Sequence, residues 1–266
     1  MVHAPCTSLW WVDSVAAAGV HFSDAKGPEN LRIYAIGDVH GRLDLLLKMY
    51  DAIIRDRAEH ASADWRIIHL GDYVDRGADS RGVIDFLIRA TGQESRVIAL
   101  AGNHDIGFLD FLAAPEPAGL FAHNGGGETA RSYGVRIDFS DPVGFRAQAE
   151  ALRKAVPEAH RTFLQGLKFS CAFGDFFFCH AGIRPGIALE SQVPADLVWI
   201  REAFLDFQGL HPKVIVHGHT PSREPEIRAN RVNVDTGAFR SGVLSALVVE
   251  GDDKQILRVS GWGGLG

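Results

Sequence analysis

Three short apolar runs, each closely followed by a loop rich in Gly, Asp, His and Asn, constrain this chain most strongly. The runs are residues 33–36, 67–70 and 97–100, and the loops after them read GDVHG, GDYVDRG and GNHD. Such runs are typical of buried strands, and glycines mark tight turns at their ends. Metal-binding side chain types therefore recur at three strand ends, a pattern that indicates a metal site.

Five sequence blocks carry a resemblance to a known family. Besides the three loops, the chain has an isolated His180 after the apolar run 176–179, and the sequence HGHT at residues 217–220. In this order and spacing the blocks resemble the calcineurin-like metallophosphoesterases. Among these the chain is most similar to the phosphoprotein phosphatase branch in its compact bacterial form, the bacterial serine/threonine protein phosphatases. The resemblance implies a metal-dependent hydrolase of phosphoric esters.

The periodicity of the first third of the chain predicts alternating strands and helices. Apolar residues on one face predict helices over 42–58 and 80–90, between strands at 31–36, 66–70 and 96–101. This β-α-β-α-β order implies neighbouring parallel strands with the helices packed outside the sheet.

The rest of the chain divides into a helical part and a second group of strands. Residues 106–165 show no strong strand signal, so we expect a helical insertion over the site, with a helix around 143–165. Strand signals return after residue 169 and predict a second sheet, largely antiparallel. The resemblance implies one α/β domain over 1–266, with a core at about 31–260. Its four-layer architecture would have two facing mixed β-sheets as a central β-sandwich flanked by helices.

The family pattern implies a dinuclear metal centre at the strand ends. It assigns the first metal ion to Asp38, His40 and Asp72, and the second to Asp72, Asn103, His180 and His219. An Asp and a His two positions apart can point to the same side, and the two oxygens of Asp72 can bridge both ions. Carboxylate, amide and imidazole ligands without a thiolate suit Mn²⁺, Fe or Zn²⁺. The expected cofactor is therefore two divalent or trivalent metal ions.

The resemblance also implies residues that act on the substrate. Two metal ions lower the pKa of a water molecule that attacks phosphorus. His104 is the candidate acid that protonates the leaving group, oriented by Asp75. The side chains expected to bind phosphate oxygens are Arg76, Arg201 and Asn103. Arg201 is assigned because the family places an arginine between the last two metal-binding histidines, and Arg184 is its rival.

Other polar residues near these blocks have simpler structural explanations. His69 lies inside an apolar strand and is expected to be a hydrogen-bonded core histidine. His217 is not expected to bind metal, because the family uses the later histidine of the block. We expect His123 in a loop, and Asp235 in a turn or beside the ligands.

The chain departs from the family pattern at two positions. Pro221 stands where many metallophosphoesterases have a final histidine, which favours the phosphoprotein phosphatase branch and leaves the first metal more open to water. Asp105 stands where that branch usually has Glu, and a shorter carboxylate could alter a contact beside the ligands. Residues 124–134 match an Asn-Gly-Gly…Thr…Ser-Tyr-Gly pattern of similar bacterial phosphatases, which is either a simple turn or part of the substrate cleft.

Composition limits the partners and the compartment. The chain of 266 residues has a net charge of −6 and no basic run, so we expect no nucleic-acid polymer as a partner. No apolar stretch approaches the roughly 20 residues of a membrane span, and residues 1–30 lack the pattern of a signal peptide. Cys6, Cys171 and Cys179 form no disulfide framework, and the last two are expected to be buried thiols. A reducing cytoplasm is the expected compartment.

Three functions remain open from the sequence. The leading prediction is a phosphomonoesterase acting on phosphoserine, phosphothreonine or phosphotyrosine in proteins, or on small phosphoesters. A dinucleoside polyphosphate hydrolase, similar to symmetrical diadenosine tetraphosphatase, shares the same blocks, as would a phosphodiesterase of this fold. The dinucleoside polyphosphate hydrolase would need side chains that stack on nucleobases, and the candidates are Phe108, Phe111, Phe121 and Tyr133. A catalytically silent binding module is disfavoured, because the chain keeps every expected ligand and the acid.

Overall fold

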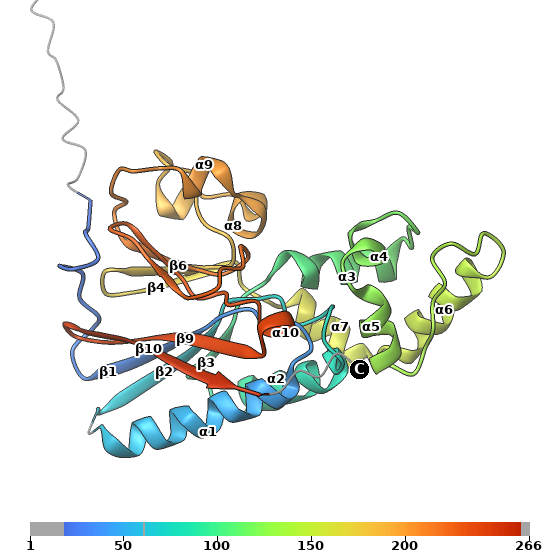
Figure 1. Cartoon of the computed structure of the whole chain (residues 1–266), viewed down its shortest axis with the longest axis horizontal. Coiled ribbons are helices and arrows are strands. Elements are labelled where there is room, and N and C mark those ends of the chain that lie inside the picture. Colours follow the sequence, from blue (N-terminus) through green and yellow to red (C-terminus); the bar gives the residue numbers. More distant parts are fainter. Residues whose placement is uncertain (1–18, 61, 262–266) are drawn as a thin grey trace, which may run out of the picture.

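Two five-stranded sheets face each other, and helices cover both outer faces (Figure 1). The computed structural model describes residues 19–60 and 62–261. Residues 19–30, the described part of the predicted lead-in, form turns and irregular segments, whereas residues 1–18 of the lead-in, with Cys6, lie outside the described residues. The predicted class, two facing mixed sheets in an α/β architecture, is confirmed.

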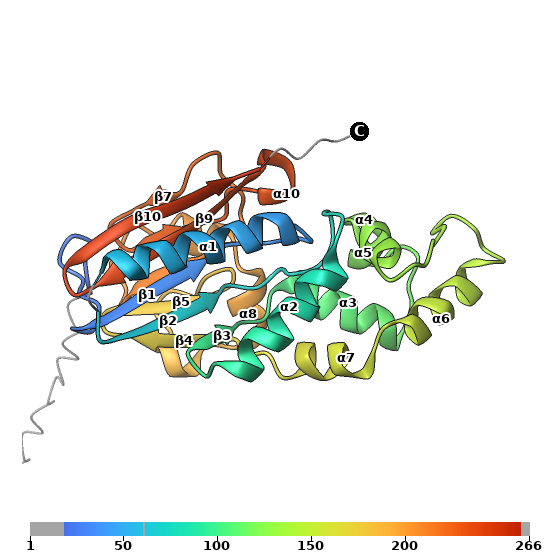
Figure 2. The same ribbon diagram turned by 90° about the horizontal axis from the view of Figure 1, so that it is seen from below.

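The first sheet has the strand order β10-β9-β1-β2-β3. Its strands are β1 (Leu31–Ile36), β2 (Asp64–His69), β3 (Val97–Ala99), β9 (Val243–Glu250) and β10 (Asp253–Ser260). As predicted, β1, β2 and β3 are parallel neighbours. The connecting helices are α1 (Leu43–Glu59) and α2 (Ser80–Gln93), and Figure 2 shows both on the outer face of this sheet.

The assignment of all later strands to the second sheet is wrong for β9 and β10. Strand β9 pairs antiparallel with both β1 and β10 and so extends the first sheet. The reason is burial on both faces: Ala246 and Val248 belong to the core under the helices, while Leu247 and Val249 belong to the core between the sheets. A strand of this kind is central, and the place beside β1 provides cover on both sides.

The second sheet has the strand order β4-β5-β6-β8-β7. Its strands are β4 (Ser170–Phe173), β5 (Phe176–Cys179), β6 (Val214–His217), β7 (Glu226–Ile227) and β8 (Arg231–Asn233). The prediction that this sheet is largely antiparallel is wrong, because β5, β6 and β8 run parallel. The chain between β5 and β6 is long enough to return in the same direction. It forms a short 3₁₀ turn, Leu189–Ser191, and the helices α8 (Pro194–Trp199) and α9 (Glu202–Leu205).

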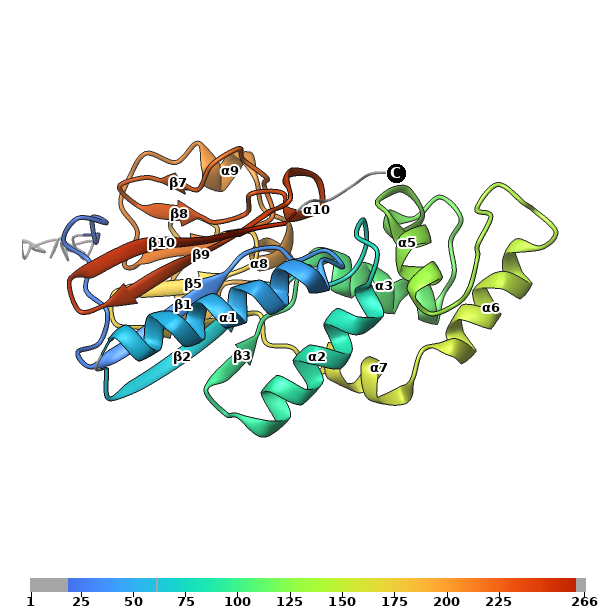
Figure 3. The same ribbon diagram turned by 60° about the horizontal axis from the view of Figure 1, so that its bottom comes forward.

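A group of helices extends beyond one end of the sheets (Figure 3). They are α3 (Asn103–Ala113), α4 (Leu120–His123), α5 (Gly126–Ser132), α6 (Phe145–Ala155) and α7 (Glu158–Gln165). The predicted helix over 143–165 is two helices. The break comes at Pro157, which has no N–H to continue a helix and instead precedes the first residue of α7. The last short helix, α10 (Ala238–Ser241), precedes β9.

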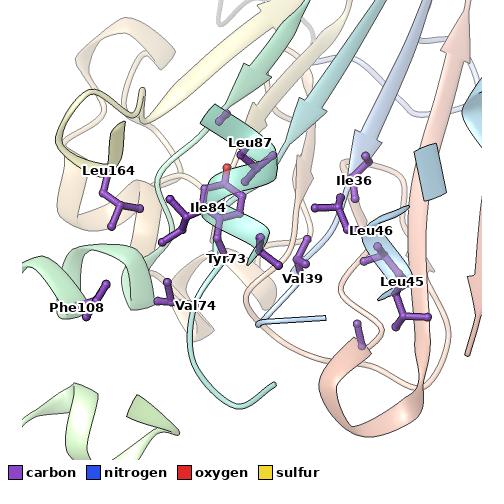
Figure 4. Packing of buried hydrophobic residues seen from close by; sticks show 14 of the residues in the cluster. Ile36, Val39, Leu45, Leu46, Tyr73, Val74, Ile84, Leu87, Phe108 and Leu164 are labelled. Carbon is purple, nitrogen blue, oxygen red and sulfur yellow. The ribbon is translucent and has the colours of Figure 1, made fainter. Parts of the chain in front are cut away.

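Alternating side chains divide the core into layers. In β5, Phe176 and Phe178 face the first sheet, whereas Phe177 and Cys179 pack with α8 and α9 on the other side. The core under α1 and α2 continues without a break into the helices α3–α7, and Figure 4 shows Tyr73, among other residues, in this continuous cluster. Because the core is shared, the loop 71–77 between the two regions is held from both sides. No helix in the described residues is both long and apolar enough to cross a membrane.

Candidate metal centre

The predicted ligands meet where the parallel strands of both sheets end. Strands β1, β2 and β3 lead into the loops 37–41, 70–77 and 100–103, and β5 and β6 lead into residues 180 and 218–219. One hydrogen bond joins the two sheets at this edge, and a second joins the ends of β5 and β6 within the second sheet. The ring Nδ1 of His180 lies 2.9 Å from the carbonyl oxygen of Leu70, and the N–H of Gly218 donates to the carbonyl of His180 at 2.8 Å.

Two groups of buried side chains lie at this edge and share Asp72. The first group is His40, Asp72 and His104, and the second is Asp72, His180 and His219. Within each group the candidate ligand atoms all lie within 4.8 Å of one another. A carboxylate common to two such groups has the position that a bridging ligand requires.

Asn103 lies with the second group, and the orientations of the His40 and His180 rings turn one nitrogen of each toward the site. The side-chain amide oxygen Oδ1 of Asn103 lies 2.9 Å from Nε2 of His180 and 2.8 Å from Nδ1 of His219. Nδ1 of His40 lies 2.7 Å from the carbonyl oxygen of Val74, so Nε2 of this ring, like that of His180, turns into the site. Metal-binding histidines commonly donate their other ring N–H to a carbonyl in this way.

Asp38 lies beside the two groups rather than within either of them. Its carboxylate accepts the backbone N–H of His219 at 3.2–3.3 Å, which links the β1 loop to the β6 loop. Gly218 permits this contact, because a Cβ at that position would overlap an oxygen of Asp38. His104 takes the place in the first group that the family pattern assigned to Asp38.

Burial sets the charge state of these side chains. It raises the pKa of Asp38 and of Asp72, and for Asp38 the nearby Asp235 adds repulsion between carboxylates. Burial lowers the pKa of His180 to about 3 and that of His219 to about 2. The cluster thus combines neutral imidazoles with two carboxylates, Asp38 and Asp72, whose charged forms burial disfavours.

His104 and Asp75 form a buried pair next to the first group. Nδ1 of His104 lies 2.7 Å from Oδ2 of Asp75, and both side chains are buried. The guanidinium of Arg76 lies between two rings, with Nη1 3.0 Å from Nε2 of His40 and Nη2 3.0 Å from Nε2 of His104. The ring of Phe239 packs against this guanidinium, 4.7 Å from its carbon to the ring centre.

Arg201 lies at the second group, and Arg184 does not. Nε of Arg201 donates to Nε2 of His219 at 3.0 Å. Arg184 forms an exposed ion pair with Asp196, with distances of 2.6 and 2.8 Å. Of the two arginines considered from the sequence, only Arg201 is within reach of a phosphate bound at the groups.

Unusual backbone conformations concentrate in the same loops. Among the described residues, six non-glycine residues have positive φ, and all but Asn30 belong to the site: His40, Asp72, Asp75, Arg76 and His219. Such conformations cost about 1–3 kcal/mol each and persist where the surroundings enforce them. Their concentration here indicates that the side-chain positions are maintained at the expense of backbone stability.

Asp105 supports the central loop. Its two carboxylate oxygens accept the backbone N–H groups of Asp72, Tyr73 and Gly102 at 2.8–2.9 Å. The shorter carboxylate, noted as a departure from the family pattern, thus forms three buried hydrogen bonds. These bonds fix the backbone that carries Asp72.

The polar residues set aside from the sequence lie outside the two groups. His217 points to Gly218, with Nδ1 3.0 Å from that carbonyl, and its Nε2 lies 3.5 Å from Arg231. His69 is a buried core residue, but only Nε2 has a partner, the Tyr50 hydroxyl at 2.9 Å. His123 is exposed at the end of α4. Asp235 accepts the Gly237 N–H at 2.8 Å, and burial raises its pKa to about 6.

Three further residues reach the site that the sequence analysis did not assign to it. Trp199, 45% exposed, has its ring centre 6.0 Å from that of His219. Phe239 packs on Arg76, and Thr129 hydrogen-bonds to Asp75. Only Thr129 had a sequence signal, the pattern over 124–134. The two aromatic residues approach through tertiary contacts that no local pattern reveals.

Comparison with known proteins identifies the family. The family model of the calcineurin-like phosphoesterases matches residues 31–243. The chain belongs to this family. Like its metallophosphoesterase relatives it is therefore a metal-dependent phosphoester hydrolase, as predicted.

The named relatives act on different classes of substrate according to their names. The chain is 28% identical over 218 residues to serine/threonine-protein phosphatase 1 of Salmonella typhimurium, covering 80% of this chain and 89% of that protein. It is also 28% identical over 234 residues to an asymmetrical bis(5'-nucleosyl)-tetraphosphatase of Anoxybacillus flavithermus, covering 80% and 88%. Among solved structures, a cold-active protein tyrosine phosphatase superposes with a TM-score of 0.57 at 16% identity, covering 87% and 80%. This last likeness concerns the fold.

The donor set of this calcineurin-like phosphoesterase fits the divalent metals that the family implies. Seven side chains converge: Asp38, His40, Asp72, Asn103, His104, His180 and His219. They are buried carboxylates, an amide oxygen and imidazoles, which are hard or borderline ligands without a thiolate. Buried carboxylates require a cation, and the neutral imidazoles have free lone pairs, so the residues present suit metal ions.

Proposed function

We propose that the chain is a phosphatase of phosphorylated serine, threonine or tyrosine in proteins. The observation that carries the proposal is the buried pair of His104 and Asp75 beside the two candidate ligand groups. An imidazole held in this way can protonate a poor leaving group such as an alkoxide, which phosphoserine hydrolysis requires. The Salmonella relative, named a serine/threonine-protein phosphatase, supports the same substrate class.

The metal ligands are proposed as the family pattern has them. The first ion would be held by Asp38, His40 and Asp72, and the second by Asp72, Asn103, His180 and His219. When bound, such ions would activate a water molecule toward phosphorus and offset the charge of the phosphate. Mn²⁺ is the ion to supply in assays, and Fe or Zn²⁺ are the alternatives.

The proton for the leaving group would come from Nε2 of His104. Asp75 accepts the Nδ1 proton, so it sets the tautomer and stabilises the imidazolium. Attack by water forms a new P–O bond and releases one proton of the water, the ester P–O bond breaks, and the leaving oxygen takes the Nε2 proton. The proton released by the water restores the protonated His104 by way of solvent. In the structure without substrate, Arg76 donates to the Nε2 atoms of His40 and His104. Phosphate oxygens would replace these nitrogens as its acceptors, together with donors from Arg201 and Asn103.

The surroundings of Asn103 favour a peptide over a polyphosphate. A cavity of about 230 Å³ runs from Asn103 along α3 to Trp199, and no basic residue lines it. Its rim carries Asp110 and Glu116, and in the described part of the chain neither carboxylate takes part in an ion pair. A tetraphosphate chain would be repelled there, whereas apolar or basic side chains next to a phosphorylated residue would be attracted.

The nucleobase-stacking residues suggested from the sequence are wrong for that role. Phe108, Phe111, Phe121 and Tyr133 are all 5% exposed or less. They pack on one another instead; for example, the ring centres of Phe111 and Phe121 are 4.4 Å apart. Stacking on a base would require their removal from the core.

A dinucleoside polyphosphate hydrolase is the second candidate. The relative from Anoxybacillus carries that activity in its name. One observation favours it: Phe239 is partly exposed, with the guanidinium of Arg76 on it and that of Arg240 5.8 Å from its ring centre. An aromatic ring with two guanidinium groups close to it could hold a base and a phosphate.

One experiment separates the two candidates. The purified chain, supplied with Mn²⁺, is assayed on phosphoserine, phosphothreonine and phosphotyrosine peptides with and without flanking lysines, and on diadenosine tetraphosphate. We expect higher kcat/KM on the peptides and a preference for flanking lysine that weakens in Asp110→Asn. Faster hydrolysis of the dinucleotide, lost on Phe239→Ala, would support the second candidate instead. The cytoplasmic compartment remains a prediction.

A further inference from the structure

A hydroxyl from the helical region contacts the carboxylate of the His104–Asp75 pair. Oγ1 of Thr129, in α5, lies 2.8 Å from Oδ1 of Asp75. The backbone N–H of Asp75 lies 2.8 Å from the same hydroxyl oxygen, so the two residues are joined by a pair of hydrogen bonds. Thr129 is fully buried, and water does not compete with these bonds.

The hydrogen bonds of Asp75 suggest one consistent assignment of donors and acceptors in this network; its backbone N–H also lies 3.2 Å from the hydroxyl oxygen of Ser80. The Asp75 N–H donates to Thr129 Oγ1, so the single hydroxyl proton of Thr129 is free to go to Oδ1 of Asp75. The hydroxyl of Ser80, 3.0 Å away, then donates to Thr129. The other oxygen, Oδ2 of Asp75, faces Nδ1 of His104. Both oxygens of Asp75 therefore have fixed partners, one on each side.

Helix α5 is itself anchored to its neighbours. The Tyr133 hydroxyl after α5 lies 2.8 Å from Nδ1 of His160, whose Nε2 lies 3.0 Å from Asp85 on α2. At the other end of the helix, the Arg76 N–H donates to the carbonyl of Gly125 at 3.2 Å. Gly125 has φ of +97°, and a Cβ there would overlap the Arg76 nitrogen. The turn before α5 and the loop of Asp75 and Arg76 therefore fit closely together.

We propose that Thr129 is a positioning residue for the proton-donating pair, so that the helical region sets the geometry of the acid. The inference rests on the proposed phosphatase function. Without the Thr129 hydroxyl, Oδ1 of Asp75 loses its donor and the carboxylate is free to rotate about its bond to Cβ. The Nδ1–H of His104 then loses a fixed acceptor. Loss of alignment should slow the reaction only where proton donation limits it.

The test compares Thr129→Val, which keeps the shape and removes the hydroxyl, with Thr129→Ser, which keeps the hydroxyl. We expect Thr129→Val to slow hydrolysis of a phosphoserine peptide by about 10-fold or more, and hydrolysis of 4-nitrophenyl phosphate by less than about 3-fold. The first effect is smaller than the ~10²–10⁴-fold contribution of a general acid, because Thr129 only positions the acid. Thr129→Ser should stay within about 2-fold of wild type on both substrates. Thr91→Val is the matched control, because Thr91 bonds only to helix carbonyls in α2.

A second readout does not depend on turnover. The Nδ1–H proton of His104, assigned by its loss in His104→Gln, is followed by NMR in metal-free protein. It should shift in Thr129→Val, return in Thr129→Ser and stay unchanged in Thr91→Val. If Thr129→Val does not fold, Thr129→Cys, a weak donor, replaces it.

Equal slowing of both substrates with an unmoved proton signal would overturn the proposal and leave Thr129 a structural role only. The proposal would also be overturned if Thr129→Ser did not restore the wild-type ratio of the two hydrolysis rates. If wild type hydrolyses neither substrate, the proposed function fails, whereas the NMR signal still tests the positioning separately.

Discussion

Nε of Arg201 donates a hydrogen bond to Nε2 of His219 over 3.0 Å. The contact determines which ring nitrogen of this histidine is left facing the proposed second metal site. Nε2 accepts from Arg201, and Nδ1 faces the side-chain amide oxygen of Asn103 at 2.8 Å. The arginine proposed to hold phosphate is thus attached to a proposed metal ligand, and the two functions are coupled through one imidazole.

The first prediction separates the two histidines of the HGHT block. His219→Ala should lose metal from the second site and lose nearly all turnover, since it removes a proposed ligand. His217→Ala should retain metal and most activity, because His217 faces Gly218 and Arg231. Metal content per chain is measured by elemental analysis. The opposite ranking would show that the ligand is assigned to the wrong histidine.

The second prediction concerns the shared carboxylate. Asp72→Asn should lower metal content at both sites at once, because Asp72 belongs to both ligand groups. The matched control is Asp252→Asn, which changes an exposed aspartate that pairs with Lys26 away from the site. Two ions per chain together with undiminished activity in Asp72→Asn would exclude a bridging role.

The third prediction concerns the acid. A general acid contributes ~10²–10⁴-fold, and more for a poor leaving group than for a good one. His104→Ala should therefore slow phosphoserine hydrolysis severely and an activated aryl phosphate less. Asp75→Asn should show the same pattern more weakly, since Asp75 acts through His104. Equal slowing of both substrates would assign His104 to phosphate binding or to positioning of the water.

The fourth prediction uses two glycines. Gly218→Ala should displace the carboxylate of Asp38, which the new Cβ would overlap, and so weaken metal binding. Gly92→Ala is the matched control: it lies in α2 with nothing within 4 Å of the added carbon. That change should stabilise the protein by roughly 0.5–1 kcal/mol. Metal titration and thermal unfolding of both variants provide the comparison, and unchanged metal affinity in Gly218→Ala would contradict the argument.

The fifth prediction concerns stability at low pH. Burial lowers the pKa of His69 to about 3, so this ring stays neutral in the folded protein while it becomes protonated in the unfolded chain. Its contribution is complete above the unfolded pKa of roughly 6.5 and is lost as pH falls below that value. The loss is at most about 1.4 kcal/mol per pH unit.

Chemical unfolding of metal-free protein between pH 7 and pH 5 measures this loss. From pH 7 to pH 5 the free energy of unfolding should fall less in His69→Gln than in wild type. The difference between the two falls is the contribution of the His69 ring. Parallel curves for the two proteins would indicate that His69 does not titrate in this way.

The local elements of the site could be predicted because the information for them is local. A buried strand that ends at glycine, followed by Asp, His or Asn, specifies both the strand and the loop that carries the ligand. The parallel order of β1, β2 and β3 follows from the alternation of strand and helix. These features place Asp38, Asp72 and Asn103 at one edge of one sheet without any knowledge of distant contacts.

The sequence did not determine which sheet β9 and β10 would join. Alternation along a strand reports how many faces are buried, and not which neighbour covers them, so only the packed structure decided that β9 lies beside β1. The contacts of Thr129 with Asp75 and of Phe239 with Arg76 are of the same kind.

By itself, the sequence determined the strand ends, the loops and the chemical types of the ligands, because those depend on neighbours along the chain. The tertiary structure decided which ring nitrogen of His219 faces the site and which side chains hold His104 in place. Those choices depend on hydrogen bonds between residues far apart in sequence, whose geometry exists only once both sheets and the helical region have packed together.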